Sequence, residues 1–144
     1  MQAVPVSPAE IAAMWGDIAD ALWPAIRQDP TYSMPTLHSR LMSGRALLFQ
    51  VSDGANGYWV VSLDSEVNQN GVNELIAWTT AIAGRIDGGP KSKVATIRHA
   101  VATLEAVLAD AGVKAHRICG RDWSRVLPEY VPYDGARNGL ERRL

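Results

Sequence analysis

Residues 84–93 read GRIDGGPKSK and combine glycines with basic side chains directly before the longest helical pattern of the chain. Glycine lets backbone N–H groups approach ligand oxygens closely, and a helix N-terminus adds a partial positive charge. The segment is therefore a candidate phosphate-binding loop. A glycine pair alone is a weak motif, and the alternative is a plain strand-to-helix connection with solvated lysines and Ser92 as the helix N-cap.

Other reactive side chains show no pattern of a metal or nucleophile site. The histidines, His38, His99 and His116, fall on three different elements without partnering cysteines or carboxylates, which favours structural or surface roles. Cys119 is the only cysteine, so an internal disulfide is excluded, and its place at the end of an apolar run predicts a buried, inert thiol. No metal site is predicted.

Helical periodicity marks the elements that would position these residues. The stretch SPAE predicts a helix start with Ser7 as N-cap and Glu10 closing a capping box. Four helices are predicted. The first runs from Pro8 to the stop at Asp29-Pro30, the second covers 35–43, and the third runs from Val94 to Gly112 at its C-terminal end. The fourth is short, covers 121–130 and is broken by Pro128.

Strand signals fill the rest of the chain. The runs ALLFQV (46–51) and YWVVSLDS (58–65) flank the turn SDGANG and predict an antiparallel hairpin. ELIAWTTAIA (74–83) is rich in β-branched and aromatic residues and predicts a buried third strand. Two further strands are predicted over 113–119 and within the closing NGLERRL.

The bulk composition suits one α/β (α+β) domain spanning residues 1–144. The 144 residues are 47% hydrophobic and 20% charged, with a formal net charge of −1. Near-neutral charge does not suggest direct binding to nucleic acid. Neither a secretory leader nor a membrane-spanning run is recognisable, so a cytoplasmic protein is expected.

The order of elements, ααβββαβαβ, resembles the GCN5-related N-acetyltransferase (GNAT) fold, a central mixed, mostly antiparallel sheet flanked by helices. The closing segments HRICGRDWSRVLPEY and GLERRL, and the helix EIAAMWGDIADALWPAI, resemble more closely the acetyltransferase-like proteins of tailed bacteriophages. The likeness covers nearly the whole chain, through short motifs.

The resemblance implies a place for each functional group. In GNAT enzymes a loop of pattern Gln/Arg-x-x-Gly-x-Gly/Ala holds the pyrophosphate of acetyl-CoA. The positions that match it or surround it here are Arg85, Gly88, Gly89, Lys91 and Lys93. Two residues depart from the pattern, because Pro90 has no N–H to donate and Asp87 adds a negative charge.

The resemblance also implies a general acid and a general base. The position of the family's tyrosine acid falls near Arg125, whose guanidinium stays charged, so Tyr130 or Tyr133 would substitute. Glu66 or Glu74 on the strands would be the base.

Two functions follow. The main expectation is a non-catalytic structural subunit of a phage virion (head, portal-tail or ejection apparatus) that needs no cofactor. It would be made in the host cytoplasm, assemble as a homo- or hetero-oligomer with other virion proteins, and bind no membrane. The five tryptophans, most of which periodicity places in the core, would supply some of the protein contacts. The basic end with Arg137, Arg142 and Arg143 would supply others, or it is a solvated strand edge.

The alternative is an acetyl-CoA-dependent N-acyltransferase acting on an amine. Open space between the strand that ends near Ala83 and the helix that begins near Val94 favours the enzyme, whereas side chains filling this space favour the structural subunit.

Overall fold

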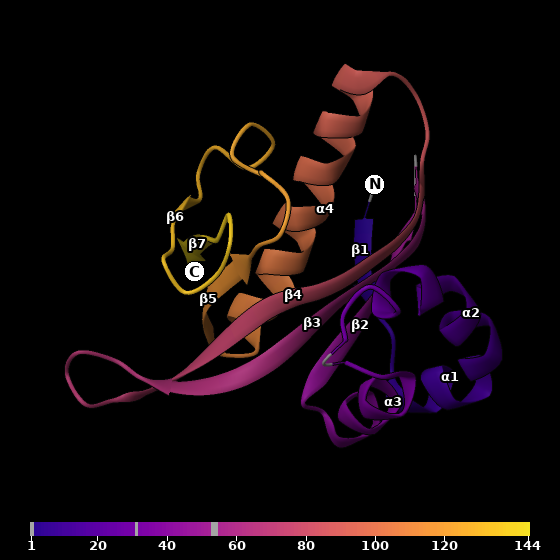
Figure 1. Cartoon of the computed structure of the whole chain (residues 1–144), viewed down its shortest axis with the longest axis horizontal. Helices are drawn as coiled ribbons and strands as arrows, with labels where there is room; N and C mark the ends of the chain where they lie inside the picture. The colour runs from indigo at the N-terminus through magenta and orange to yellow at the C-terminus, as the bar shows by residue number, and fades with distance from the viewer. Residues whose placement is uncertain (1, 31, 53–54) are drawn as a thin grey trace.

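The computed structural model describes residues 2–30, 32–52 and 55–144 (Figure 1). The helices are α1 (Pro8–Ala13), α2 (Trp15–Ile26), α3 (Met34–Ser43) and α4 (Pro90–Asp110). The strands are β1 (Gln2–Pro5), β2 (Ala46–Ser52), β3 (Ala55–Val67), β4 (Asn73–Ile86), β5 (Val113–Ile118), β6 (Val131–Pro132) and β7 (Leu140–Arg143).

In the described part of the chain the strands form one seven-stranded sheet in the order β1-β2-β3-β4-β5-β7-β6. Neighbours pair antiparallel except β4 and β5, which are parallel because α4 carries the chain back between them. The mixed, mostly antiparallel sheet with flanking helices confirms the predicted fold class. The hairpin turn SDGANG lies partly outside the described residues.

Helices cover both faces of the sheet, so the core has two clusters. On the α1–α3 side, apolar residues of these helices pack against β2–β4, including Ile18, Leu22, Leu37, Leu48 and Val60. On the α4 side, Leu104 and Leu108 pack with Phe49, Trp59 and Ile118. Figure 1 shows α4 on one side of the strands and α1–α3 on the other. The sheet is therefore a middle layer in which the central strands β2–β4 are packed on both faces.

The helix predicted from Pro8 to Asp29-Pro30 is divided into two helices, α1 and α2. Ser7 caps α1 as expected, because the Glu10 amide donates to its Oγ at 3.2 Å and its own hydroxyl donates to the Glu10 carboxylate at 2.9 Å. Met14, at φ −113° and ψ 16°, then interrupts the helical backbone before α2. The helix over 35–43 is confirmed as α3, with Ser33 as N-cap and Gly44 left-handed at φ +78°.

The predicted helix over 121–130 is wrong. Asp122 accepts hydrogen bonds from the Ser124 amide at 3.0 Å and the Ser124 hydroxyl at 2.6 Å, which favours a turn over a helix. A single turn follows, closed by the Leu127 amide on the Trp123 carbonyl, before Pro128. The apolar spacing there reflects core contacts of Leu127 and Tyr130.

The prediction of a solvated strand edge at the basic end is confirmed for Arg142 and Arg143, whose side chains are 42% and 56% exposed. β7 lies between β5 and β6, but β6 pairs only with Leu140 and Glu141, so beyond Glu141 the strand pairs with β5 alone. The guanidinium of Arg142 pairs with Glu105 at 2.9 Å, and that of Arg143 pairs with Glu74 at 2.6 Å. Arg137 is exposed in the loop before β7.

Candidate functional site

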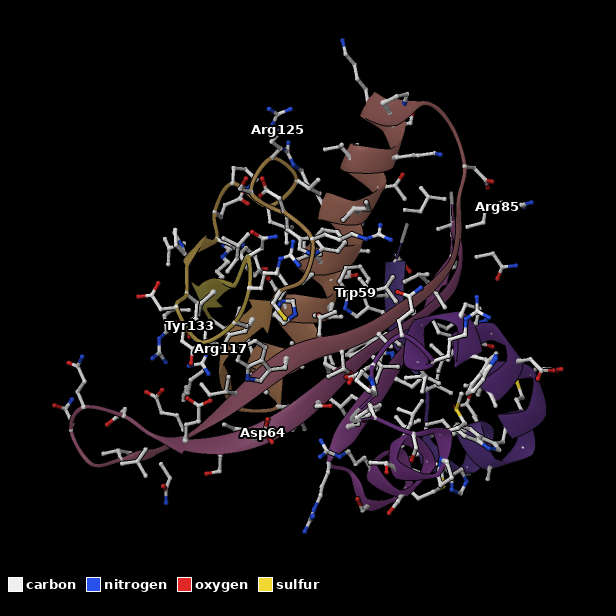
Figure 2. The ribbon with its side chains drawn as sticks, in the orientation of Figure 1. Trp59, Asp64, Arg85, Arg117, Arg125 and Tyr133 are labelled. Carbon is white, nitrogen blue, oxygen red and sulfur yellow. The ribbon has the colours of Figure 1, made fainter. Side chains whose placement is uncertain are left out.

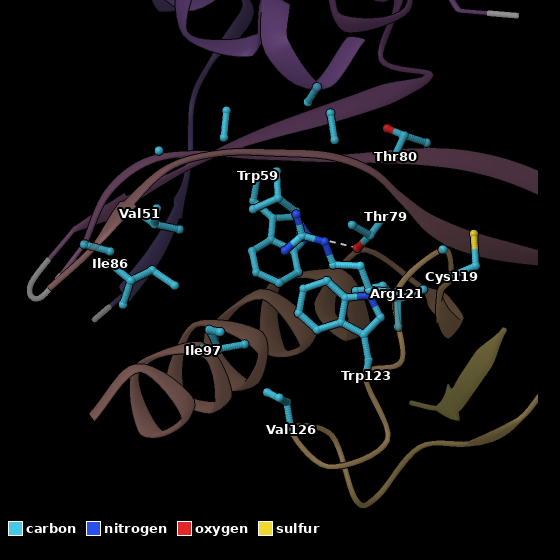
Figure 3. Close-up of a pocket in the computed structure, with 18 of the residues that line it drawn as sticks. Val51, Trp59, Thr79, Thr80, Ile86, Ile97, Cys119, Arg121, Trp123 and Val126 are labelled. Atoms are coloured by element: carbon cyan, nitrogen blue, oxygen red, sulfur yellow. Dashed lines mark hydrogen bonds between the residues drawn. The ribbon is translucent and has the colours of Figure 1, made fainter. Parts of the chain in front are cut away.

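The parallel strands β4 and β5 separate part-way along their length. They pair from Leu75 and Val113 to Trp78 and Arg117, after which β4 continues as far as Ile86 beside β3 alone. A cavity of about 770 Å³ occupies the space between the separated strands and α4 (Figure 3). Most of the lining comes from residues 79–86 of β4 and from residues 118–123, which begin at the last residue of β5. Further lining residues are Val51, Trp59, Ile97 and Val126.

Backbone groups of β4 are available to this cavity. From Thr79 onward the strand pairs with β3 on one side only. Alternate residues of an antiparallel pair direct their N–H and C=O groups away from the partner strand, so these groups of β4 face the open side. The register between β3 and β4 shifts at Val60 and Val61, which leaves Thr80 as the extra residue of a β-bulge in β4. Such a bulge bends the strand, here close to the point where β4 leaves β5.

The loop 84–93 joins the cavity-lining end of β4 to α4. Gly88 has φ +93°, where a Cβ would lie 2.9 Å from the Ser92 Cβ, so the turn requires glycine. The N-cap of α4 is Gly89, which provides no side-chain cap, and Pro90 is the first helical residue. Ser92, expected as the N-cap, is the third helical residue, because the chain enters the helix at Pro90.

The two residues that depart from the phosphate-loop pattern, Pro90 and Asp87, leave backbone amides and a basic surface at the start of α4. The first intrahelical bond runs from the Lys93 amide to the Gly89 carbonyl, so the Lys91 and Ser92 amides precede the hydrogen-bonded ladder. Pro90 removes only one donor from this group. The Asp87 carboxylate pairs with Arg85 at 3.4 Å. Lys91 and Lys93 are exposed, which leaves the start of α4 cationic.

The segment after β5 contributes polar groups to the cavity wall. Arg121 and Trp123 enter from this segment toward Trp59 and Thr79 (Figure 3). The Trp123 indole N–H is buried and has no hydrogen-bond partner among the described residues, so a donor is available to a ligand acceptor. Cys119 is only partly buried and lines the cavity, which corrects the prediction of a buried thiol. Its partial burial raises the pKa of the thiol, which favours the protonated form.

A continuous hydrogen-bond chain runs from the cavity into the core. Trp59 Nε1 donates to Thr79 Oγ1 at 2.8 Å, and Thr79 Oγ1 lies 2.6 Å from His116 Nε2. His116 Nδ1 lies 2.5 Å from the Tyr130 hydroxyl, which donates to Glu105 at 2.7 Å. The second Glu105 oxygen accepts from Arg142 at 2.9 Å.

These bonds define the proton positions. Since the Tyr130 hydroxyl donates its proton to Glu105, its oxygen must accept from His116 Nδ1–H. The Nε2 atom of His116 is then unprotonated and accepts the Thr79 hydroxyl proton. Burial lowers the pKa of His116 to about 4, so the ring is neutral at pH 7. Burial, and then the bond to Glu105, raise the pKa of Tyr130 far above its ordinary value.

His116 makes stability depend on pH. An unfolded histidine takes up a proton near pH 6.5, whereas the folded ring does so only near pH 4. The unfolded state therefore binds more protons in this window, and stability falls as the pH falls through it. We expect wild type to lose about 3 kcal/mol of unfolding free energy between pH 6.5 and 4 relative to His116→Asn. Urea titrations across this range measure it, and parallel curves for the two proteins would contradict it.

The predicted acid residues lie outside the cavity lining. Tyr130 is 6% exposed and is held within the hydrogen-bond chain. The ring of Tyr133 stacks on the Arg117 guanidinium at 4.0 Å and meets Trp78 edge-on, on the paired part of β4 and β5 (Figure 2). Arg125 is exposed, and its carbonyl accepts a bond from Arg98.

The two candidate bases, Glu66 and Glu74, are held by arginines at the hairpin end of β3 and β4. Glu66 pairs with Arg117 at 2.5 Å and Glu74 with Arg143 at 2.6 Å. The bond from Arg143, then that from Asn68, lowers the pKa of Glu74. Neither carboxylate lines the cavity. In the described ranges, no three histidine, cysteine, aspartate or glutamate side chains gather as metal ligands.

Comparison with known proteins places this architecture. No family model and no curated protein matches the chain. A solved structure of a protein of unknown function from Enterococcus faecalis V583, described as a probable N-acyltransferase, matches 89% of this chain with a TM-score of 0.55 and 16% identity. This chain has a GNAT-like fold.

The GNAT-like chain spans only part of that protein, covering 31% of its length. A chain of the AtaT–AtaR complex bound to DNA matches 74% of this chain and 73% of its own length, with a TM-score of 0.45 and 11% identity. Neither identity level carries activity from the matched protein to this one. Among the described residues, no helix has the length and apolar character needed to span a bilayer.

The sequence predictions missed several residues of the candidate site. Trp59, Thr79, Arg121 and Trp123 line the cavity, and His116 lies directly behind Thr79. One signal was available, because Thr79 and Thr80 interrupt the apolar run ELIAWTTAIA with adjacent hydroxyls. His116, at a buried position of β5, is a second. Polar residues at buried strand positions need partners, and here those partners form the site.

Proposed function

We propose that this protein is an acetyl-CoA-dependent N-acyltransferase that acts on an amine. One observation carries the proposal: a cavity of about 770 Å³ opens where β4 leaves β5, beside the loop that leads to the uncapped start of α4. A pocket of this size is within the range of small-molecule sites.

The residues present fit acetyl-CoA in two places. The free edge of β4 from Thr79 to Ile86 offers alternate amide and carbonyl groups, which suit an extended chain that itself carries amides. The start of α4 offers the Lys91 and Ser92 amides and the Lys91 and Lys93 ammonium groups, which suit a pyrophosphate. When bound, acetyl-CoA would supply the activated acyl group, and the protein would position it.

The proposal uses some of the predicted site residues and leaves the roles of others unsupported. Arg85, Gly88, Gly89, Lys91 and Lys93 stay as the predicted anion-binding group. The roles of Tyr130 and Tyr133 as acid, and of Glu66 and Glu74 as base, stay predictions with no support from the cavity lining.

The virion-subunit expectation, with its phage relation, oligomeric partners and particle location, also stays a prediction. Neither of the two solved structures described above is named as a bacteriophage protein. Trp23 on α2, 52% exposed, is the tryptophan on which a partner contact would first be tested. The fold likeness to a probable N-acyltransferase supports the enzyme instead.

The direct test is release of free CoA thiol from acetyl-CoA in the presence of a panel of amines, including primary alkylamines, polyamines, amino acids and aminoglycosides. We expect thiol release that depends on one amine class and a matching acetylated product by mass spectrometry. No amine-dependent release with any member, from folded protein at high concentration, would contradict the proposal.

Substitution at Gly89 separates helix stability from anion binding. Gly89 has the extended backbone of an N-cap (φ −82°, ψ 178°), and a Cβ there meets nothing within 4 Å. We expect Gly89→Asp to raise the unfolding free energy by roughly 0.5 kcal/mol through capping and to weaken acetyl-CoA binding by about tenfold through charge repulsion.

Gly89→Asn is the matched control, because it also caps α4 but adds no charge. We expect it to stabilise similarly and to lose much less affinity than Gly89→Asp. Calorimetric titration and urea unfolding of the three proteins measure both effects. Equal affinity of the Asp and Asn variants would show that phosphate does not bind at the start of α4.

A further inference from the structure

The hydrogen-bond chain behind the cavity connects the proposed acyl-transfer site with a base. We propose that Thr79 receives the proton of the attacking amine and passes its own proton to His116, with Tyr130 and Glu105 as positioning residues for the imidazole. This inference rests on the proposed function, and it assigns the base to a residue outside the carboxylates and tyrosines considered from the sequence.

Thr79 is the point at which this chain meets the cavity. Its side chain is part of the cavity lining, at the position where β4 begins to leave β5. The hydroxyl oxygen accepts from Trp59 Nε1 at 2.8 Å, and its proton is directed at His116 Nε2, 2.6 Å away. A hydroxyl oxygen has two lone pairs, so one is free to accept a proton from a substrate amine.

His116 is prepared to take this proton. The ring is 0% exposed, and its Nδ1–H is held by Tyr130, which is held in turn by Glu105. Arg142 binds the other Glu105 oxygen at 2.9 Å and fixes the carboxylate. This order of groups, hydroxyl, imidazole, orienting group and carboxylate, keeps Nε2 unprotonated and directed at the Thr79 hydroxyl. The lowered pKa of His116, about 4, means that the lone pair is free at neutral pH.

The charged groups near His116 are each paired with a partner of opposite charge. Glu105 from α4 faces it through Tyr130, and Arg142 from β7 binds the far side of that carboxylate. Arg117, the next residue of β5, is bonded to Glu66 and Glu141. Thr79 from β4 is the neutral group at Nε2. The nearest charge along the chain is therefore the negative carboxylate.

The proposed proton transfer balances without another reactant. As the amine nitrogen bonds to the acyl carbon, Thr79 Oγ1 accepts the nitrogen's proton while the Thr79 proton moves to His116 Nε2. When the carbon–sulfur bond breaks, His116 returns this proton through Thr79 to the departing sulfur. The products are an amide and a free thiol, and His116 and Thr79 end as they began.

A merely structural network would share this geometry, so the test needs two readouts. The first is the tautomer of His116 from ¹⁵N-edited NMR of the imidazole at pH 7. We expect a neutral ring protonated at Nδ1 in wild type and loss of that preference in Tyr130→Phe. A wild-type ring that is protonated at Nε2, or charged, overturns the proposal whether or not an amine substrate is known.

The second readout is steady-state acyl transfer by Thr79→Val and Thr79→Ser. We expect Thr79→Val to lower kcat by about 100-fold or more, with KM for acetyl-CoA within a few-fold of wild type, and Thr79→Ser to restore most of kcat. Circular dichroism of both variants checks that they are folded. If the valine variant is misfolded, the kcat values of Thr79→Ser and Tyr130→Phe are compared with each other instead. An active wild type with a fully active valine variant overturns the relay alone, whereas an inactive wild type overturns the proposed function and the relay with it.

Discussion

Replacing Arg117 by methionine is expected to lower the unfolding free energy by about 3 kcal/mol. The guanidinium, on a side chain that is 6% exposed, donates to Glu66 at 2.5 Å and to Glu141 at 2.6 Å. It also lies 4.0 Å from the ring centre of Tyr133. Methionine keeps much of the volume but leaves the 15%-exposed Glu141 side chain as a nearly buried carboxylate without its main partner.

The functional consequence is local, since Arg117 is the last residue of β5 that pairs with β4 before the cavity opens. Loss of the guanidinium is expected to weaken the packing at the point where β4 and β5 separate. Arg143→Met is the matched control, because its ion pair with Glu74 involves a side chain that is 56% exposed. That change is expected to cost no more than about 1 kcal/mol. Chemical unfolding measures both, and equal losses would contradict the special role of Arg117.

Ile82→Trp is expected to weaken acetyl-CoA binding by about 100-fold, which corresponds to about 3 kcal/mol of binding free energy. Ile82 lines the cavity and is the register partner of Trp59, so their side chains share one face of the sheet. An indole at this position would occupy space between the separated strands. Because Ile82 is 37% exposed, the change should alter the unfolding free energy by less than about 1 kcal/mol.

Ile82→Val serves as the control, since it keeps the β-branched side chain and enlarges the cavity slightly. It is expected to bind acetyl-CoA within a few-fold of wild type. Isothermal titration calorimetry compares the three proteins. Unchanged affinity in a folded tryptophan variant would place the ligand elsewhere.

Much of the fold followed from local physics that is visible in the sequence. Ser7, Ser33 and Gly44 act at helix ends as their types predict, and the strands of the central meander are apolar runs bounded by turn residues. β1 and β6 were missed, because strands of four and two residues carry too little periodicity to distinguish them from loops. The prediction of a helix over 121–130 was wrong because the apolar residues there have helical spacing but serve as core contacts of a turn.

The site was less predictable, because its groups meet only through tertiary structure. The hydrogen-bond chain joins β3, β4, β5, β7 and α4 with the loop before β6, and links between its members span up to 37 residues of sequence. Sequence spacing could indicate the loop at Gly88 and Gly89, whose residues are contiguous. It could not indicate that Thr79 and His116 meet, since parallel pairing of β4 with β5 depends on how α4 returns the chain.

The central claim is that acetyl-CoA binds between the separated strands β4 and β5. Titration of ¹⁵N-labelled protein with acetyl-CoA, followed by backbone amide NMR, tests this claim most directly. The predicted result is saturable shifts concentrated in residues 79–86, 88–93 and 118–123, with little change at the hairpin around Asn70. No shifts at millimolar acetyl-CoA, or shifts confined to another surface, would contradict it.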